Sequence, residues 1–457
     1  MSIVRRVRVR VPVCLRARRH EVPSPVLATL TVRNFRRYLI GQLTSNIGTW
    51  MQRAAQDLLV LHLTGNSGSA VGLVTALQFL PQTLFGLTGG VLADRFPKRR
   101  LLLITQTAMA VQSLLLGVLT VTEAVNLPSV YALAFALGTA TAMDTPARNA
   151  FISELVARER VPAAVSLNSA QFNIARTLGP AIAGLTVAAA GTGPVFLLNA
   201  ASYLAVLYGL ISIRPAELSS PGPPRHGGTR LRDAFRHIRS TPDLLLPITL
   251  IGFVGTFGLN FQVTTSLMAI TVFHSGAAVF GYLSAAYAIG SLIGALRGAG
   301  RGQPPTAPRL ITATVVFGTL EAVLGLMPGY GTFLALLIPT GLAAATVTTT
   351  ANSLTQLHAD PHLRGRVMSV YFLVLLGGTP IGAPLVGLVS DTLGARSTLI
   401  LAGIVSAASA LALPALVSAR TRRLDRTNKP MTQADAPLTD TPGPALSGKA
   451  PTNQSTT

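Results

Sequence analysis

The sequence is poor in charged side chains: they make up 12% of its 457 residues, whereas soluble proteins usually carry about 25%. It has a single cysteine, Cys14, so no disulfide can form within the chain. It also lacks the G-x-x-x-x-G-K-[ST] loop that cradles nucleotide phosphates, and it lacks H-E-x-x-H and cysteine–histidine clusters. We therefore expect no ATP-driven step, no catalytic residues, no metal and no cofactor.

Acidic residues are scarcer than basic ones, 16 against 37, which gives a formal net charge of +21. A balance this basic can indicate a nucleic-acid-binding protein. Here, however, the basic residues form short clusters between apolar runs of about 20 residues, the length that crosses a bilayer. The pattern therefore predicts the lipid bilayer as the partner and no nucleic acid.

Hydropathy predicts an all-α polytopic membrane protein with about twelve transmembrane helices. They fall near residues 38–63, 69–93, 100–121, 127–146, 164–189, 193–213, 243–271, 277–297, 308–328, 331–352, 366–390 and 395–417. Basic residues gather in every second loop, and Arg396 is the one basic residue expected in the others. By the positive-inside rule this alternation predicts a multi-pass protein of the bacterial inner membrane with both termini in the cytoplasm.

The chain divides into two apolar halves with polar segments around them. We expect a basic tail (1–37), a six-helix half (38–214), a cytoplasmic linker (215–242), a second six-helix half (243–418) and a disordered tail (419–457). Within the linker, residues 231–239 predict a basic amphipathic helix that lies on the membrane surface.

The two halves carry similar glycine patterns, which predicts two six-helix pseudo-repeats. One spacing recurs in the fifth and eleventh predicted helices: Gly179, Gly184 and Gly191 against Gly382, Gly387 and Gly394. Small residues at such positions let helices pack closely, and Pro180 adds a kink where helices must rock.

The loop between the second and third predicted helices reads G-V-L-A-D-R-F-P-K-R-R. It resembles the signature loop of the major facilitator superfamily, G-x-L-A-D-R-x-G-R-K-R, with Pro97 in place of the usual glycine. The resemblance implies the major facilitator fold. It also implies a conformational latch, in which Asp94 caps the eleventh helix and the basic residues pair with the cytoplasmic end of the fourth helix. The latch set is Gly90, where helices would approach, with Asp94, Arg95, Lys98, Arg99, Arg100 and Asp144. The alternative is that these charges only fix topology.

Further stretches resemble the enterobactin-exporter branch of that superfamily: I-G-T-W-M-Q from Ile47, D-T-P-A-R-N-A-F from Asp144 and L-R-G-R-V-M-S from Leu363. This resemblance implies proton-coupled efflux of a small molecule such as a drug, siderophore or secondary metabolite. The Gly179-Pro180 and Gly184 pattern partly matches the motif of proton-driven antiporters, although close packing alone also explains it. Import on the same fold and a non-transporting sensor or scaffold remain alternatives.

The first predicted helix is unusually polar for a membrane span. Asn46, Trp50, Arg53 and Asp57 fall in one stripe at 100° per residue, and other polar side chains lie beside it. Arg53 and Asp57, at i and i+4, are placed so that they are able to offset each other's desolvation cost. The stripe predicts either one wall of a central substrate cavity or a structural ion pair.

Glu321 lies inside the ninth predicted helix with no partner on its own helix. A carboxyl at membrane depth is a functional candidate by default, and a structural bond to a neighbouring helix is the alternative. The full set predicted for the path of substrate and protons is Asn46, Trp50, Gln52, Arg53, Gln56, Asp57, Asn260, Gln262 and Glu321.

Overall fold

The computed structural model describes residues 25–218, 231–300, 305–360 and 362–427. Most of the expected N-terminal tail, the centre of the linker and the expected disordered tail from residue 428 lie outside the described residues. Every regular element in the described part is a helix.

The first half contains α1 (Pro25–Leu30), α2 (Arg33–Leu63), α3 (Gly68–Arg95), α4 (Lys98–Val121), α5 (Leu127–Leu155), η1 (Arg158–Arg160), α6 (Val161–Ala190), α7 (Thr192–Ile211) and η2 (Pro215–Glu217). The second contains α8 (Leu231–Ser240), α9 (Pro242–Phe253), η3 (Val254–Gly258), α10 (Phe261–Leu267), η4 (Met268–Val272), α11 (Ala277–Gly300), α12 (Ala307–Leu326), α13 (Tyr330–His358), α14 (Arg364–Gly377), α15 (Thr379–Leu393) and α16 (Ala395–Thr427). Each predicted span coincides with one helix, or with a consecutive series where α9 to η4 and α14 to α15 follow one another.

Eight of the described helical spans are long and apolar enough to cross a membrane, or nine if the bent α3 counts as one. The polar helices α2, α5 and α6 are not among them. In the part of α2 from residue 50 to residue 58 the polar side chains are buried: Gln52, Gln56 and Asp57 are 0% exposed and Arg53 is 4% exposed. Their hydrogen-bonding groups face other helices, so the polarity that lowers the hydropathy of α2 is hidden inside the bundle. The layout of twelve spans stays a prediction.

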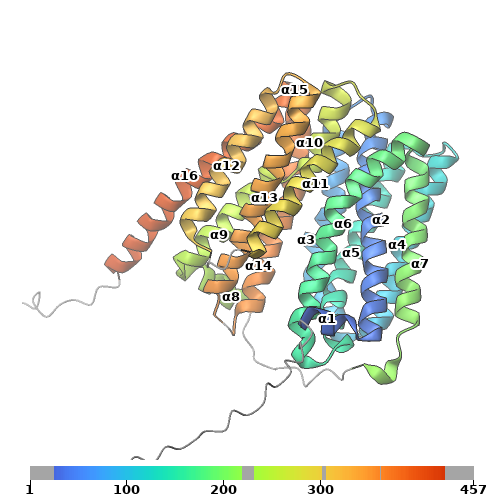
Figure 1. The fold of residues 1–457 in the computed structure, drawn as a ribbon, viewed down its shortest axis with the longest axis horizontal. Coiled ribbons are helices and arrows are strands. Elements are labelled where there is room, and N and C mark those ends of the chain that lie inside the picture. Colours follow the sequence, from blue (N-terminus) through green and yellow to red (C-terminus); the bar gives the residue numbers. More distant parts are fainter. Residues whose placement is uncertain (1–24, 219–230, 301–304, 361, 428–457) are drawn as a thin grey trace, which may run out of the picture.

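The helices form two groups, α2 to α7 and α9 to α16, which lie side by side in Figure 1. They meet at the end where α3 begins and α15 ends, here called the upper end. They diverge toward the lower end, which carries α1 and α8. The largest apolar cluster crosses between the groups and joins Val71 and Val74 of α3 to Ala383 and Val386 of α15. We call this arrangement the upper-closed state.

Glycines bring the two halves into backbone contact at the upper end. A Cβ added to Gly184 of α6 would collide with Gly281 of α11, and one added to Gly387 of α15 would collide with the carbonyl of Gly68. Two glycines of the predicted helix-packing motif thus lie where the halves touch.

The other two predicted packing glycines lie within their own halves. Gly179, followed by Pro180 inside α6, lies against α2, because an added Cβ would be 2.5 Å from the Trp50 Cβ. Gly382 of α15 lies against the Thr256 carbonyl of η3. All four positions therefore require a residue without a side chain.

Gly191 and Gly394 end α6 and α15 with φ of +82° and +86°. Glycine adopts this backbone region without the steric cost that a Cβ brings. A glycine with positive φ thus ends the corresponding helix in each half, which agrees with the repeated glycine spacing.

Two helices, α8 and α16, differ from what the sequence predicts. The amphipathic helix is present as α8, but Ala234 and Ile238 are buried in the core, so part of its apolar face packs on protein rather than lipid. α16 continues to Thr427, into the expected disordered tail, because the arginines, leucine and alanine there favour helix.

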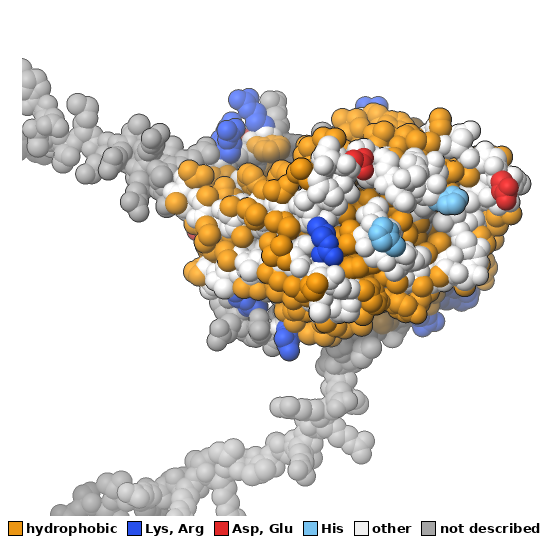
Figure 2. Space-filling model, turned by 90° about the horizontal axis from the view of Figure 1, so that it is seen from above, with side chains coloured by type: hydrophobic (Ala, Val, Ile, Leu, Met, Phe, Trp, Pro, Cys, Tyr) orange, Lys and Arg blue, Asp and Glu red, His pale blue; other side chains and the backbone are white. Residues whose placement is uncertain are grey.

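The upper surface is mostly hydrophobic and carries few charged side chains (Figure 2). Arg396, the one basic residue expected in the upper loops, donates hydrogen bonds to the carbonyls of Gly325 and Met327 near the end of α12. A cation there satisfies carbonyl groups that the helix leaves free. Arg396 thus has a structural role. Its place at the upper end therefore does not contradict the gathering of arginines at the lower end.

Candidate functional site

Two of the predicted path residues on α2 point into the first half instead of toward the second. Gln52 donates to Gln112 (3.0 Å) and accepts from Asn199 (2.8 Å). Gln56 accepts a hydrogen bond from Gln78 at 3.1 Å. These amides tie α2 to α4, α7 and α3, so both glutamines hold the first half together.

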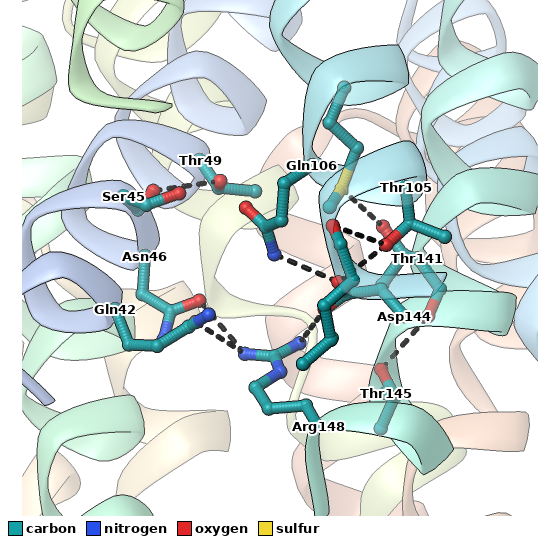
Figure 3. Close-up of polar contacts among 12 residues, drawn as sticks. Gln42, Ser45, Asn46, Thr49, Thr105, Gln106, Thr141, Asp144, Thr145 and Arg148 are labelled. Atoms are coloured by element: carbon teal, nitrogen blue, oxygen red, sulfur yellow. Dashed lines mark hydrogen bonds and ion pairs between the residues drawn. The ribbon is translucent and has the colours of Figure 1, made fainter. Parts of the chain in front are cut away.

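A buried ion pair on α5 organises the polar side chains of the first half (Figure 3). Arg148 and Asp144 are 2.9 Å apart, one helical turn from each other. Asp144 also accepts from Thr105 at 2.9 Å and from Gln106 at 2.8 Å. Arg148 donates to Asn46 of α2 at 3.2 Å. The two charges thus offset each other, and Asp144 Oδ1 and the Arg148 guanidinium have hydrogen-bond partners besides, which lowers the cost of burying the pair.

A cavity of about 30 Å³ lies beside this ion pair, between α2, α4, α5, α6 and α7. Its lining is Ser45, Asn46, Thr49, Trp50, Arg53, Gln106, Met109, Thr141, Asp144, Arg148, Phe172 and Tyr203. A drug-sized ligand needs about 300–1,000 Å³. The cavity is therefore water-sized, and binding of a larger solute here requires the surrounding side chains or helices to move.

The predicted ion pair between Arg53 and Asp57 is wrong. No carboxylate lies within 4 Å of Arg53 among the residues that the structure describes, and Arg53 makes no hydrogen bond to them. Its guanidinium instead lies over Trp50, 4.9 Å from the ring centroid, and over Phe79 at 4.4 Å. An arginine at the centre of a span costs about 2.5–3.5 kcal/mol on insertion scales, so this position needs a compensating reason.

Asp57 is fully buried and joins the two halves. It accepts a hydrogen bond from Gln262 of α10 at 2.7 Å and one from Thr75 of α3 at 3.4 Å. Two predicted path residues, Asp57 and Gln262, thus meet at the junction of the halves. Asn260 instead donates to the Thr256 carbonyl of its own helical segment at 2.7 Å.

Glu321 is 2% exposed, and its Oε2 has no hydrogen-bond partner in the described part of the chain. The hydroxyl of Ser406 on α16 is also buried and has no hydrogen-bond partner among the described residues. Both oxygens border Gly258 of η3: a Cβ there would lie 3.1 Å from Glu321 Oε2 and 2.8 Å from Ser406 Oγ. The π-helical η3 is a kind of segment that often occurs at functional sites. Glu321 lies inside the second half and does not line the cavity.

The basic residues of the signature loop pair within the first half. Lys98 forms an ion pair with Glu154 in the last turn of α5 at 2.8 Å. Arg99 donates to the carbonyls of Leu210 and Ile211 at the end of α7, at 2.8 and 2.9 Å. The implied pairing with the lower end of the fourth helix is therefore present, but the partner is Glu154. Asp144 is unavailable because it pairs with Arg148.

Asp94, Arg95 and Arg100 are exposed at the lower end. In the described residues the Asp94 carboxylate has no hydrogen bond or ion pair, so it caps no helix in the upper-closed state. Gly90 does not make the expected close approach, since a Cβ there would have nothing within 4 Å. Gly89 makes that approach, against the backbone of Ala142 on α5.

Asp391, which is not among the residues predicted from the sequence, caps a helix across the two halves. This residue of α15 accepts from the backbone N–H groups of Gly68 (2.6 Å) and Ser69 (2.9 Å) and from Ser67 Oγ (3.2 Å). Those groups open α3, where free N–H groups and the helix dipole favour a negative charge. The carboxylate therefore fastens the upper end of one half to the other.

Arg176 of α6 was also missed. Its guanidinium lies 5.9 Å from the Trp50 ring centroid. It also lies close enough to Tyr287 and Tyr371 of the second half to interact with them electrostatically. The residue lies inside the predicted span 164–189, so the criterion that singled out Glu321 would have found it.

Comparison with known proteins gives a family for the chain. The profile of a family described as "Transmembrane secretion effector" matches residues 24–446. The chain is 27% identical to the enterobactin exporter EntS of Citrobacter koseri, over 73% of this chain and 78% of that protein. It is 26% identical to EntS of an Escherichia coli strain (83% and 90% covered) and to the staphyloferrin A transporter of Staphylococcus aureus (78% and 90% covered).

Solved structures of transporters share the fold. The nucleoside transporter NupG matches with a TM-score of 0.65 at 14% identity, over 84% of this chain and 99% of that one. A bacterial homologue of the human lysosomal transporter Spinster, in an inward-facing and unoccupied conformation, matches with a TM-score of 0.65 at 13% identity, over 86% and 98%. At these identities the likeness concerns the fold alone.

Proposed function

The chain belongs to the transmembrane secretion effector family of the major facilitator superfamily, and we propose that it is a secondary active exporter of a small molecule driven by proton antiport. The family description and the relatives named as siderophore exporters support export. The observation that carries the proposal is the upper-closed arrangement. Two halves held together at one end and diverging toward the other form one of the two states that alternating access needs.

The arginine-rich lower end is placed in the cytoplasm under this proposal. The upper-closed state then receives solute from the cytoplasm. To release it outside, the halves must separate at Asp391 and at the glycine contacts and close at the lower end. Asp94, free in the upper-closed state, would then cap the start of α14 and hold the lower-closed state.

Glu321 is the residue we assign to proton coupling. A charged carboxyl without a partner is unfavourable in an apolar interior, so its protonation responds to any change of surroundings. Because Glu321 borders η3, and η3 leads into α10 with Gln262, movement of this segment can link protonation to the contact between Asp57 and Gln262.

Import on the same fold is the second candidate, because the structural neighbours include a D-xylose–proton symporter. Untargeted mass spectrometry of cells and culture medium, with and without the gene, separates the two. Export predicts a solute that accumulates in cells without the gene and falls in their medium. A solute depleted from cells would indicate import. No change in any solute would favour the sensor or scaffold alternative.

The orientation in the membrane can be tested with reporter fusions. We expect fusions within residues 56–68, 121–127 and 191–194 to report the periplasm, and fusions at residue 225 and at the C-terminus to report the cytoplasm, because basic loops stay inside. A periplasmic C-terminus would contradict an even number of spans.

Asp94→Ala should slow transport at least several-fold while membrane abundance stays near the unaltered level. The carboxylate acts in only one of two states, so its loss changes their populations. Flux is measured at matched expression, with Glu159→Gln, an exposed acidic residue of η1, as the control. Equal flux in Asp94→Ala and the control would overturn the latch.

A further inference from the structure

Two buried arginines line the same cavity, and only one of them is in direct contact with a carboxylate. Arg148 has a carboxylate at 2.9 Å and donates to Asn46. Arg53 is 4% exposed but has neither a carboxylate within 4 Å nor a hydrogen-bond acceptor among the described residues. The cavity therefore has a cation in its wall that interacts with Asp57 only at a distance, and that has no hydrogen-bond partner in the described chain.

The surroundings of Arg53 leave its hydrogen-bonding groups free. Trp50 and Phe79 lie against the guanidinium, with centroids 4.9 and 4.4 Å from its central carbon. Such contacts use the face of an aromatic ring, whereas the five N–H donors of arginine lie in the guanidinium plane. A buried donor without an acceptor is costly, and the cavity is where an acceptor can enter.

A second cation lies on the same aromatic cluster. Arg176 is 5.9 Å from the Trp50 ring, and no carboxylate lies within 4 Å of it in the part of the chain described. Three arginines, Arg53, Arg148 and Arg176, lie here against two carboxylates: Asp144, which pairs with Arg148, and Asp57, whose charge the neutral amide of Gln262 does not offset. The charges facing this place are thus positive in balance.

We propose that the exported solute is a small organic anion with a flat apolar body. A carboxylate or similar oxyanion would take two hydrogen bonds from the fork of Arg53. The flat body would lie against the aromatic cluster around Trp50. The ring centroid of Trp50 is 6.4 Å from that of Phe79 and 6.0 Å from that of Phe172. This substrate class rests on the proposed function, since it takes the cavity as part of the transport path.

The chain offers a built-in probe of this place, because Trp50 is its single tryptophan. Tryptophan fluorescence of the purified full-length protein therefore reports on the surroundings of this one residue. The probes are benzoate, its neutral analogue benzamide, its cationic analogue benzylamine and the saturated anion cyclohexanecarboxylate. We expect benzoate to change the emission saturably, the uncharged and cationic probes to bind at least ten-fold more weakly, and the saturated anion to fall between. A protein that responds best to benzylamine or benzamide, or to no probe, contradicts the proposal.

Variants assign the effect to the guanidinium. Arg53→Gln removes the charge and should weaken benzoate binding at least ten-fold. Arg53→Lys keeps the charge, loses the fork and should weaken it less. Arg158→Gln removes an equal charge from the exposed η1 and should bind as the unaltered protein does. Unchanged binding in Arg53→Gln contradicts the proposal, and the probe series on the unaltered protein decides it even if that variant does not fold.

Transport measured on the same preparations separates this inference from the proposed function. Efflux of a cationic solute by a protein that ignores benzoate would leave an exporter standing and overturn the anion class. Benzoate binding that needs Arg53, in a protein that transports no solute in vesicles, would leave the anion site standing and contradict export.

Discussion

Asp391→Asn should move the protein out of the upper-closed state and reduce transport by roughly five- to thirty-fold. The carboxylate accepts three hydrogen bonds at the start of α3, from the other half of the molecule. An exposed charge at a helix start, with its hydrogen bonds, contributes about 1–2 kcal/mol, which corresponds to that change in population. Asparagine keeps the shape and removes the charge, so folding of each half should be unaffected.

Distances between spin labels measure this shift directly. With Cys14 replaced by serine, one label pair reports the upper end and another the lower end; they use the exposed positions Ala124 with Thr332, and Ala157 with Ser240. In Asp391→Asn the upper distance should lengthen and the lower one shorten. Glu123→Gln, an exposed acid at the same end, is the control and should resemble the unaltered protein. Unchanged distances in Asp391→Asn would show that this carboxylate does not decide between the states.

Glu321→Gln should abolish the response of transport to a pH gradient, with at least a ten-fold loss of gradient-driven flux. The side chain keeps its size but can no longer bind or release a proton. Because Glu321 does not line the cavity, ligand binding reported by Trp50 should remain. Flux in proteoliposomes with and without an imposed gradient provides the measurement.

Two further variants make the Glu321 experiment specific. Ser406→Ala removes the neighbouring hydroxyl and should change the pH at which flux is half-maximal without abolishing coupling. Glu159→Gln removes an exposed carboxyl and should couple normally. If Glu321→Gln follows the gradient as the unaltered protein does, Glu321 is structural and protons move elsewhere.

The positions of the helices could be read from the sequence, because most of the predicted spans are apolar runs bounded by polar residues, and helix length follows from membrane thickness. Side-chain partners across helices could not be read in the same way. Asp57 bonds to Gln262, 205 residues away, and Asp391 bonds to Gly68, 323 residues away. Spacing along one helix predicts which side chains are able to meet, and tertiary packing decides which of them do.

The errors at the site have the same origin. The i, i+4 spacing gave equal grounds for pairing Arg53 with Asp57 and Arg148 with Asp144, and only the second pair forms. Both carboxylates accept hydrogen bonds from neutral side chains, but Arg148 turns toward Asp144, whereas Arg53 lies over the rings of Trp50 and Phe79. Arg176 was within reach of sequence reasoning, since an arginine inside a predicted span calls for an explanation.

The most direct test of proton-driven export uses membrane vesicles turned inside out, loaded with acid and supplied with the solute that mass spectrometry identifies. In such vesicles the lower end faces the medium, so an exporter moves solute inward. Proton-driven export predicts uptake that needs the acidic interior, stops when the pH gradient is collapsed and is absent with Glu321→Gln. Uptake only by right-side-out vesicles, or uptake indifferent to the gradient, would contradict it.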